Sequence, residues 1–216
     1  MRLLAIILAL GIAVPACQSA GQALDPSTPE TRPIAVTVYG GVATGQVRFD
    51  GEVGASLTED YDTGGIAGLR IGTWHEVATD LDLGVALDGS WYVAERSQPS
   101  YRFTTVTLSP LAMARFSPRQ VPVWPYMGVG PAIAYQDADL GTSGAFTFKD
   151  EGFAYGLDAR AGLEIPIGPN VAIDLGYRFL YLENTFKSPS LLGTVVGNVD
   201  TTETSHFGLV GISFRF

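Results

Sequence analysis

The chain ends in SHFGLVGISFRF, residues Ser205–Phe216, and this stretch decides the fold. Successive side chains of a β-strand point to opposite faces, so Val210, Ile212, Phe214 and Phe216 share one apolar face. The other face carries small residues and one charge: Ser205, Gly211, Ser213 and Arg215. Such a strand fits poorly in a soluble core. It matches a transmembrane barrel, in which one face meets lipid and the other a polar lumen.

The same two-residue period recurs upstream. It is clearest in Leu81–Ala94, where Asp82 and Asp88 share the face opposite the large apolar residues. Carboxylates on an inner face are costly in a dry core and ordinary in a polar lumen. The predicted strands are 33–43, 63–74, 81–94, 101–116, 123–136, 151–165, 170–183 and 205–216. We therefore predict an all-β chain that forms an eight-stranded antiparallel up-and-down transmembrane β-barrel. Pro110 predicts a bulge or a local break in pairing.

The connections alternate in length. Long polar loops are predicted at 44–62, 95–100, 137–150 and 184–204, and short turns at 75–80, 117–122 and 166–169. In bacterial outer-membrane barrels the long loops are extracellular. The predicted loops carry many acids: Glu52, Glu59, Asp60, Asp62, Asp137, Asp139, Asp150, Asp200 and Glu203. These acids suggest either a solvated cell-surface coat, which we favour, or sites for divalent cations.

The face opposite the apolar one carries five arginines and five carboxylates: Arg70, Arg115, Arg160, Arg178, Arg215, Asp82, Asp88, Asp158, Glu164 and Asp174. A barrel of eight strands is narrow enough to be filled by side chains, and an unpaired buried charge is strongly destabilising. We therefore expect a paired network that fills the lumen, in preference to a gated ion path. Aromatic girdles are expected at the strand ends on the lipid face: Trp91, Phe116, Tyr135, Phe153, Tyr181, Phe214 and Phe216.

The N-terminus has the pattern of an export signal. Arg2 precedes the apolar run Leu3–Val14, which is too short to span a bilayer. Residues 1–23 are predicted to be a signal peptide cleaved after Ala23, and 24–32 a flexible lead-in to a barrel domain at 33–216. A rival interpretation is lipidation at Cys17, because Val14-Pro15-Ala16-Cys17 is similar to a lipobox, although Pro15 departs from that pattern.

Composition excludes several function classes. The net charge of −9 argues against a nucleic-acid partner. Gly128-Val129-Gly130 lies in a predicted strand with no helix after it, so it is not a dinucleotide-binding loop. The sequence shows no metal-ligand cluster and no phosphate loop, and no cofactor is expected. The chain ends at its last predicted strand, so a wall-anchoring role through a following domain is not expected.

Three stretches besides the terminal GISFRF carry a family resemblance: SPLAMARF at Ser109–Phe116, PYMGVGP at Pro125–Pro131 and DLGYRF at Asp174–Phe179. With them the chain resembles the small outer-membrane β-barrel superfamily of Gram-negative bacteria, which contains surface antigens, opacity-type proteins and the transmembrane domain of outer membrane protein A. The resemblance implies an outer-membrane location among lipid and lipopolysaccharide. It also implies that the barrel-assembly machinery reads the last strand through Val210, Ile212, Phe214 and Phe216.

The resemblance leaves three functions open. The leading hypothesis is a non-enzymatic barrel with a structural or surface-interaction role, carried by loops that bind an extracellular ligand. The second is a lipid A-modifying enzyme. Tyr181-Leu182-Glu183-Asn184 is similar to the His-x-Ser-Asn signature of outer-membrane deacylases, but only Asn184 matches. Ser205 and His206 are adjacent, so their side chains point to opposite faces and cannot form a simple dyad. The third is a small-solute or ion pore.

Overall fold

The structure is a computed structural model that describes residues 34–51, 56–97, 100–118, 121–143, 146–186, 190–191, 194–195 and 199–216. All of them belong to one compact unit, Thr31–Phe216. The predicted signal peptide, the lead-in at 24–32 and Cys17 lie outside the described residues. Within those ranges no helix is long and apolar enough to cross a membrane.

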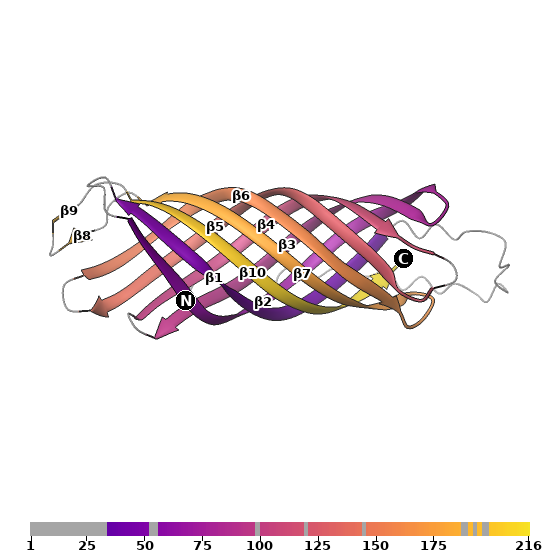
Figure 1. Ribbon diagram of the computed structural model, residues 1–216, viewed down its shortest axis with the longest axis horizontal. Helices are drawn as coiled ribbons and strands as arrows, with labels where there is room; N and C mark the ends of the chain where they lie inside the picture. Colours follow the sequence, from indigo (N-terminus) through magenta and orange to yellow (C-terminus); the bar gives the residue numbers. More distant parts are fainter. Residues whose placement is uncertain are drawn as a thin grey trace. The chain divides into compact units, whose positions relative to one another are not determined.

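Eight long antiparallel strands form the wall of the molecule (Figure 1). They are β1 (Ile34–Gly51), β2 (Ser56–Ala78), β3 (Leu81–Ser97), β4 (Ser100–Phe116), β5 (Trp124–Ser143), β6 (Phe146–Pro166), β7 (Val171–Phe186) and β10 (Val199–Arg215). Two-residue strands β8 (Ser190–Leu191) and β9 (Thr194–Val195) lie between β7 and β10. Consecutive long strands pair, and β10 pairs with β1, so the sheet closes on itself. The predicted eight-stranded up-and-down barrel is confirmed.

Apolar side chains cover the outside of the barrel. Val210, Ile212 and Phe214 on β10 and Phe216 directly after it point outward and are 62, 48, 40 and 55% exposed. No outward residue from Gly208 to Phe216 is polar or charged, and this stretch has the length of about 9–11 residues that a tilted strand needs to cross a bilayer. All eight strands contribute to this apolar belt, with residues such as Val38, Ile71, Val85, Leu108, Val129, Leu157, Leu175 and Val210.

The strands extend well beyond the apolar belt at the end opposite the short turns. Residues 44–62 were expected to form a loop, but β1 and β2 pair from Gly45↔Tyr61 to Asp50↔Ser56. Residues 137–150 likewise belong to paired strands up to Ser143↔Phe146. Outward side chains above the belt meet water and are polar, so the sequence loses its apolar alternation although the ladder continues. The predicted lengths of these loops were therefore wrong.

The acidic residues assigned to loops change position accordingly. Paired strands carry Glu59, Asp60, Asp62, Asp137, Asp139, Asp150, Asp200 and Glu203. Glu203 is only 3% exposed and lies inside the barrel. Its assignment to a solvated loop was therefore wrong, because the inner face of β10 continues upward past Ser205. Glu52 lies outside the described residues.

Pro110 interrupts one of its two ladders. The pairing of β4 with β3 runs without a shift through Leu87↔Pro110. The pairing with β5 stops after Leu108 and resumes at Ala112 in the same register, which places Pro131 opposite Pro110. Neither proline has an N–H group to donate. The local break therefore occurs, and a bulge does not.

The interior has two halves with different chemistry. The half near the short turns holds the ten charged residues predicted for the lumen. The half near the long hairpins is packed with apolar side chains, among them Tyr39, Ile66, Tyr92, Phe103, Leu180, Leu182, Phe186, Phe207 and Leu209. The predicted charge network was expected to fill the lumen. In this second half the interior is instead mainly apolar, with a buried polar cluster around Glu203.

Candidate functional site

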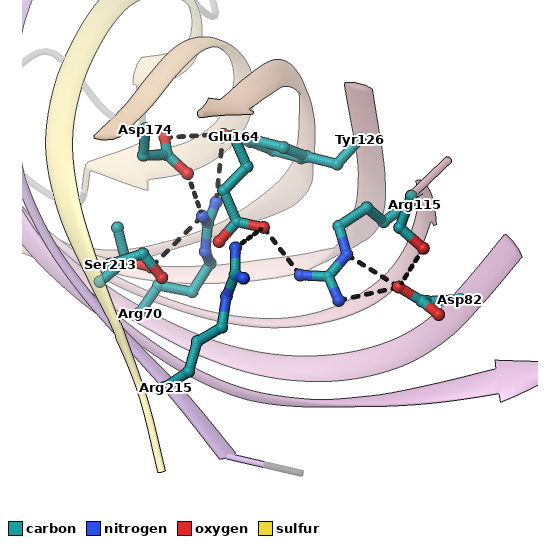
Figure 2. A network of polar contacts seen from close by, with 10 residues as sticks. Arg70, Asp82, Arg115, Tyr126, Glu164, Asp174, Ser213 and Arg215 are labelled. Carbon is teal, nitrogen blue, oxygen red and sulfur yellow. Dashed lines mark hydrogen bonds and ion pairs between the residues drawn. The ribbon is translucent and has the colours of Figure 1, made fainter. Parts of the chain in front are cut away.

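The charged residues nearest the short turns form a first cluster, the lower layer, shown in Figure 2. Arg115 on β4 donates from Nε and Nη2 to Asp82 Oδ2, at 3.0 and 2.8 Å, and from Nη1 to Glu164 Oε2 at 2.7 Å. Arg215 on β10 approaches the same Glu164 oxygen at 3.2 Å. Glu164 therefore joins two arginines that come from different sides of the barrel.

Arg70 on β2 completes the lower layer. Its Nη2 lies 2.6 Å from Asp174 Oδ2 on β7, and the Tyr126 hydroxyl donates to the other oxygen of Asp174 at 2.9 Å. The members of the layer are Arg70, Arg115, Arg215, Asp82, Glu164 and Asp174. Three cations face three anions, so the layer is neutral.

Two tryptophans cover the guanidinium groups of the lower layer. The Arg115 guanidinium lies 4.4 Å from the ring centroid of Trp74 and 5.0 Å from that of Trp124. The Arg215 guanidinium lies 4.3 Å from the Trp124 centroid. Cation–π contact partly replaces the water that these faces lose on burial. Neither tryptophan was predicted to contribute to the lumen, although the alternation of the sequence indicates the strand and the face of each.

A second cluster, the middle layer, lies between the lower layer and the apolar half. It holds Arg160, Arg178, Asp88 and Asp158, whose side chains are at most 1% exposed. Arg160 and Arg178 are direct cross-strand neighbours on β6 and β7, an arrangement that alone would be repulsive. Asp158 approaches Arg160 at 3.1 Å and Arg178 at 2.7 Å, and Asp88 lies 2.7 Å from Arg160. The two carboxylates thus balance the charge of the two neighbouring guanidinium groups.

All ten charged residues predicted for the lumen lie on the inner face, with exposures between 0 and 9%. The structure brings them together as these two neutral layers. A cavity beside Arg70 and Thr37 has a volume of about 10 Å³, close to the least space that holds one water molecule.

Glu203 is an inner charged residue that the sequence analysis missed. Its Oε1 accepts hydrogen bonds from Tyr92 at 2.7 Å and from Ser205 at 2.5 Å, and its Oε2 accepts one from Gln136 at 2.6 Å. Asn184 donates in turn to Gln136 at 3.1 Å. The signal was present, because Glu203 continues the two-residue period of Ser205 and Arg215.

The outer face above the belt carries hydrogen-bonded aromatic residues. The Tyr181 hydroxyl donates to Glu183 at 2.5 Å, and the Tyr177 hydroxyl lies 2.6 Å from Nδ1 of His206. Ser205 is buried inside the wall, so it shares no face with His206. The predicted girdle residues Trp91, Phe116, Phe153, Phe214 and Phe216 are between 40 and 62% exposed.

A crevice of about 970 Å³ opens in the wall between the upper parts of β6, β7 and β10. Its lining is mostly polar and acidic, with two aromatic rings: Glu151, Gly152, Phe153, Tyr155, Glu183, Asn184, Thr185, Asp200, Thr201 and Thr202. Within the ranges that the structure describes, no three His, Cys, Asp or Glu side chains lie close enough to hold a metal ion. The crevice therefore presents carboxylates and backbone without a metal cage.

The last strand is bound on both sides. β10 pairs with β1 and with β7, and the terminal Phe216 donates its backbone N–H to the carbonyl of Ile34 at 2.9 Å. Val210, Ile212, Phe214 and Phe216 thus form a row on the lipid-facing side of the closing seam.

Comparison with known proteins gives this architecture a family. The family model described as the outer membrane protein beta-barrel domain matches residues 5–216. A search of curated protein sequences found no match to the chain. Among solved structures, the chain is similar to the outer membrane protein OprG from Pseudomonas aeruginosa, with 12% identity, 84% of this chain and 95% of that chain covered, and a TM-score of 0.53.

Two further solved structures match the chain with lower TM-scores. Neisserial surface protein A is 24% identical, with 84% of this chain and 99% of that chain covered and a TM-score of 0.44. Ail, the attachment invasion locus protein of Yersinia pestis, is 17% identical, with 85% and 99% covered and a TM-score of 0.41. The predicted resemblance and location are confirmed. The chain belongs to the outer membrane protein β-barrel domain family and lies in the outer membrane.

Proposed function

We propose that this protein is a closed outer-membrane anchor, without enzymatic activity, that presents its long hairpins as an interaction surface outside the cell. One observation carries the proposal. The interior is occupied by two neutral layers of ion pairs and then by a mainly apolar core, which encloses the hydrogen-bonded cluster around Glu203. A side-chain core of this kind stabilises the barrel and leaves little room for solute.

Conductance tests the closed state. The protein is reconstituted in a planar lipid bilayer, and single-channel current is recorded beside a known open porin as the positive control. The proposal expects no discrete current steps. Reproducible steps that scale with the amount of folded protein would establish a pore and overturn the proposal.

The non-enzymatic assignment has its own test. Ser205 and His206 lie on opposite sides of the wall, and Ser205 donates to Glu203 instead of to a histidine. The proposal therefore expects identical lipid A mass spectra from cells with and without the protein. An acyl chain lost or gained only when the protein is present would restore the enzyme hypothesis.

We further infer that residues 1–23 are removed during export and that the assembly machinery recognises the last strand. Intact mass of the mature protein tests the first inference: a chain beginning at Leu24 supports it, and a lipidated Cys17 contradicts it. Deletion of Phe216 tests the second inference. We expect a smaller fraction of heat-modifiable, folded barrel in the outer membrane, whereas undiminished assembly would argue against recognition of this end.

A further inference from the structure

The upper edge of the apolar belt is marked by two polar residues on the outer face of the closing seam. β10 lies between β1 and β7 (Figure 1). Above Val42 the next outward residue of β1 is Thr44, and above Gly208 the next outward residue of β10 is His206. Thr44 and His206 are direct cross-strand neighbours. They therefore lie where the lipid headgroups begin, in the outer leaflet, because this end of the barrel carries the long hairpins.

A tyrosine from β7 fixes the ring of His206. The Tyr177 hydroxyl lies 2.6 Å from Nδ1 of His206, and the centroids of the Phe179 and His206 rings are 5.4 Å apart. A phenolic hydroxyl that donates to Nδ1 leaves the proton of a neutral imidazole on Nε2. His206 then has one N–H directed away from Tyr177, on the same outer face as the hydroxyl of Thr44. Two donors on neighbouring strands suit an anionic oxygen ligand.

Directly below His206 the outer face lacks a side chain. Gly208 pairs with Val42 on one side and with Tyr177 on the other, and both of these side chains are exposed. A Cβ on Gly208 would meet only Val42 Cγ2, at 3.8 Å. Gly40, diagonally next to Gly208, is a second outward glycine. The position of Gly208 between Val42 and Tyr177, here called the notch, lets an acyl chain lie flat against the wall.

The acidic residues of the crevice lie farther up the barrel. Glu183 pairs with Thr202, which is four residues from His206, or roughly 13 Å along the strand. Asp200 lies farther still on the same strand. A negatively charged group beside His206 is therefore out of contact with both carboxylates.

The surroundings of the seam decide the class of ligand. This face is embedded in the outer membrane, so its occupant is a lipid and not a soluble molecule. Donors at headgroup height, directly above a notch for an acyl chain, match a lipid that carries phosphate. In the outer leaflet such a lipid is the lipid A part of lipopolysaccharide.

We propose that Thr44, His206 and the notch form a binding site for one molecule of lipid A. Nε2–H of His206 and the hydroxyl of Thr44 donate to a phosphate oxygen, and an acyl chain of the same molecule lies in the notch. Tyr177 is a positioning residue that orients the imidazole. The site goes beyond the surface-interaction role given above and does not depend on it, because it uses neither the hairpins nor the interior.

Native mass spectrometry measures the lipid that the protein retains. The full-length mature protein is released from dodecyl maltoside micelles that contain added lipid A, and we expect saturable retention of one molecule. Lipid A stripped of its phosphates keeps the acyl chains, and we expect its retention to be at least about tenfold weaker, because hydrogen bonds to charged groups are strong. Equal retention of the two lipids, or no saturable retention of lipid A, would overturn the site.

Protein variants locate the site. His206→Ala removes a donor and Gly208→Leu fills the notch, and we expect each to weaken retention of lipid A at least about tenfold. His75→Ala is the first control, since His75 points outward near the short turns, beside Leu83. Gly89→Leu is the second control, because Gly89 is an outward glycine of β3 with nothing within 4 Å of its Cβ position. Both controls should retain lipid A as the wild type does.

Heat-modifiable migration verifies that each variant is folded. The site is refuted if either site variant retains lipid A as the wild type does, or if the two controls lose as much retention as the site variants.

The tautomer of His206 gives a readout that does not involve lipid. The chain has two histidines, so nitrogen-15 histidine NMR at alkaline pH resolves both, and His75→Ala assigns them. We expect the Nε2-protonated tautomer in the wild type, and loss of this preference in Tyr177→Phe, which keeps the ring but lacks the hydroxyl. An Nδ1-protonated His206 in the wild type would leave no outward N–H donor and would overturn the site.

Discussion

The ion pairs of the middle layer make a quantitative prediction about stability. Replacement of Arg160 by methionine keeps an unbranched apolar stem but removes the guanidinium group and its charge. Asp88 then loses the guanidinium at 2.7 Å and keeps the Tyr39 hydroxyl at 2.6 Å. Asp158 keeps Arg178 at 2.7 Å. The layer changes from neutral to a net charge of −1, with Asp88 as the carboxylate that lacks a cation.

The magnitude follows from burial. The side chains of Arg160 and Asp88 are 1 and 0% exposed, so water cannot solvate the remaining carboxylate. Removal of one partner of such a pair costs about 3–5 kcal/mol. The double variant Arg160→Met/Asp88→Asn restores neutrality, since Arg178 still faces Asp158. Its free energy of unfolding should therefore exceed that of the single variant by about 1–3 kcal/mol, the cost of leaving a buried polar group without its partner.

Urea unfolding in lipid vesicles, followed by tryptophan fluorescence, measures these differences through the transition midpoint and slope. The matched control is Arg102→Met on the outer surface. Arg102 and Glu95 are 60 and 59% exposed and lie 3.2 Å apart, so this change should cost less than about 1 kcal/mol. The reasoning fails if Arg160→Met costs no more than the control, or if the double variant is no more stable than the single variant.

Three further predictions concern other parts of the barrel. Glu203→Leu should lower the free energy of unfolding by about 2–4 kcal/mol, because it leaves three buried donors without their acceptor; a urea midpoint equal to wild type would contradict this. Gly156→Ala should cost roughly 1–3 kcal/mol by overpacking, since its Cβ would lie 1.7 Å from the carbonyl oxygen of Tyr181. Gly89→Ala, with nothing within 4 Å, is its control and should be tolerated. Brominated lipid should quench the fluorescence of Trp91 on the outer face but not that of Trp74 or Trp124 under the arginines, as single-tryptophan variants would show.

The sequence predicted the faces of the strands well within the membrane. In that region every second residue meets lipid and is apolar, so apolar residues alternate with lumen-facing ones along each strand. Val210 and Arg215, for example, lie on the faces that the two-residue period assigns. The upper parts of β1 and β2 were predicted to be a loop. Outward residues that face water are polar in a strand as well as in a loop, as at Gln46 and Asp60, so the sequence does not distinguish the two there.

The contents of the lumen were harder to predict. Periodicity places Arg70 on the inner face, but it does not indicate that Asp174, more than one hundred positions away, is its partner. The partner depends on barrel closure and stagger, which no local pattern contains. The same limit applies to the crevice between β6, β7 and β10, because its position depends on where the hydrogen-bonded ladder between β6 and β7 ends.

The partners of the lumen arginines also constrain how the protein assembles. Arg70 on β2 meets Asp174 on β7, and Arg160 on β6 meets Asp88 on β3, so these charges come from strands that are not neighbours in the sheet. A partly built, open sheet could not bring them together, and in hydrocarbon each unpaired charge would cost several kcal/mol. Pairs between neighbouring strands, such as Arg115 with Asp82, can form before the sheet closes, but the pairs that cross the barrel cannot. We therefore expect closure of the barrel and its entry into the membrane to be coupled, instead of insertion hairpin by hairpin.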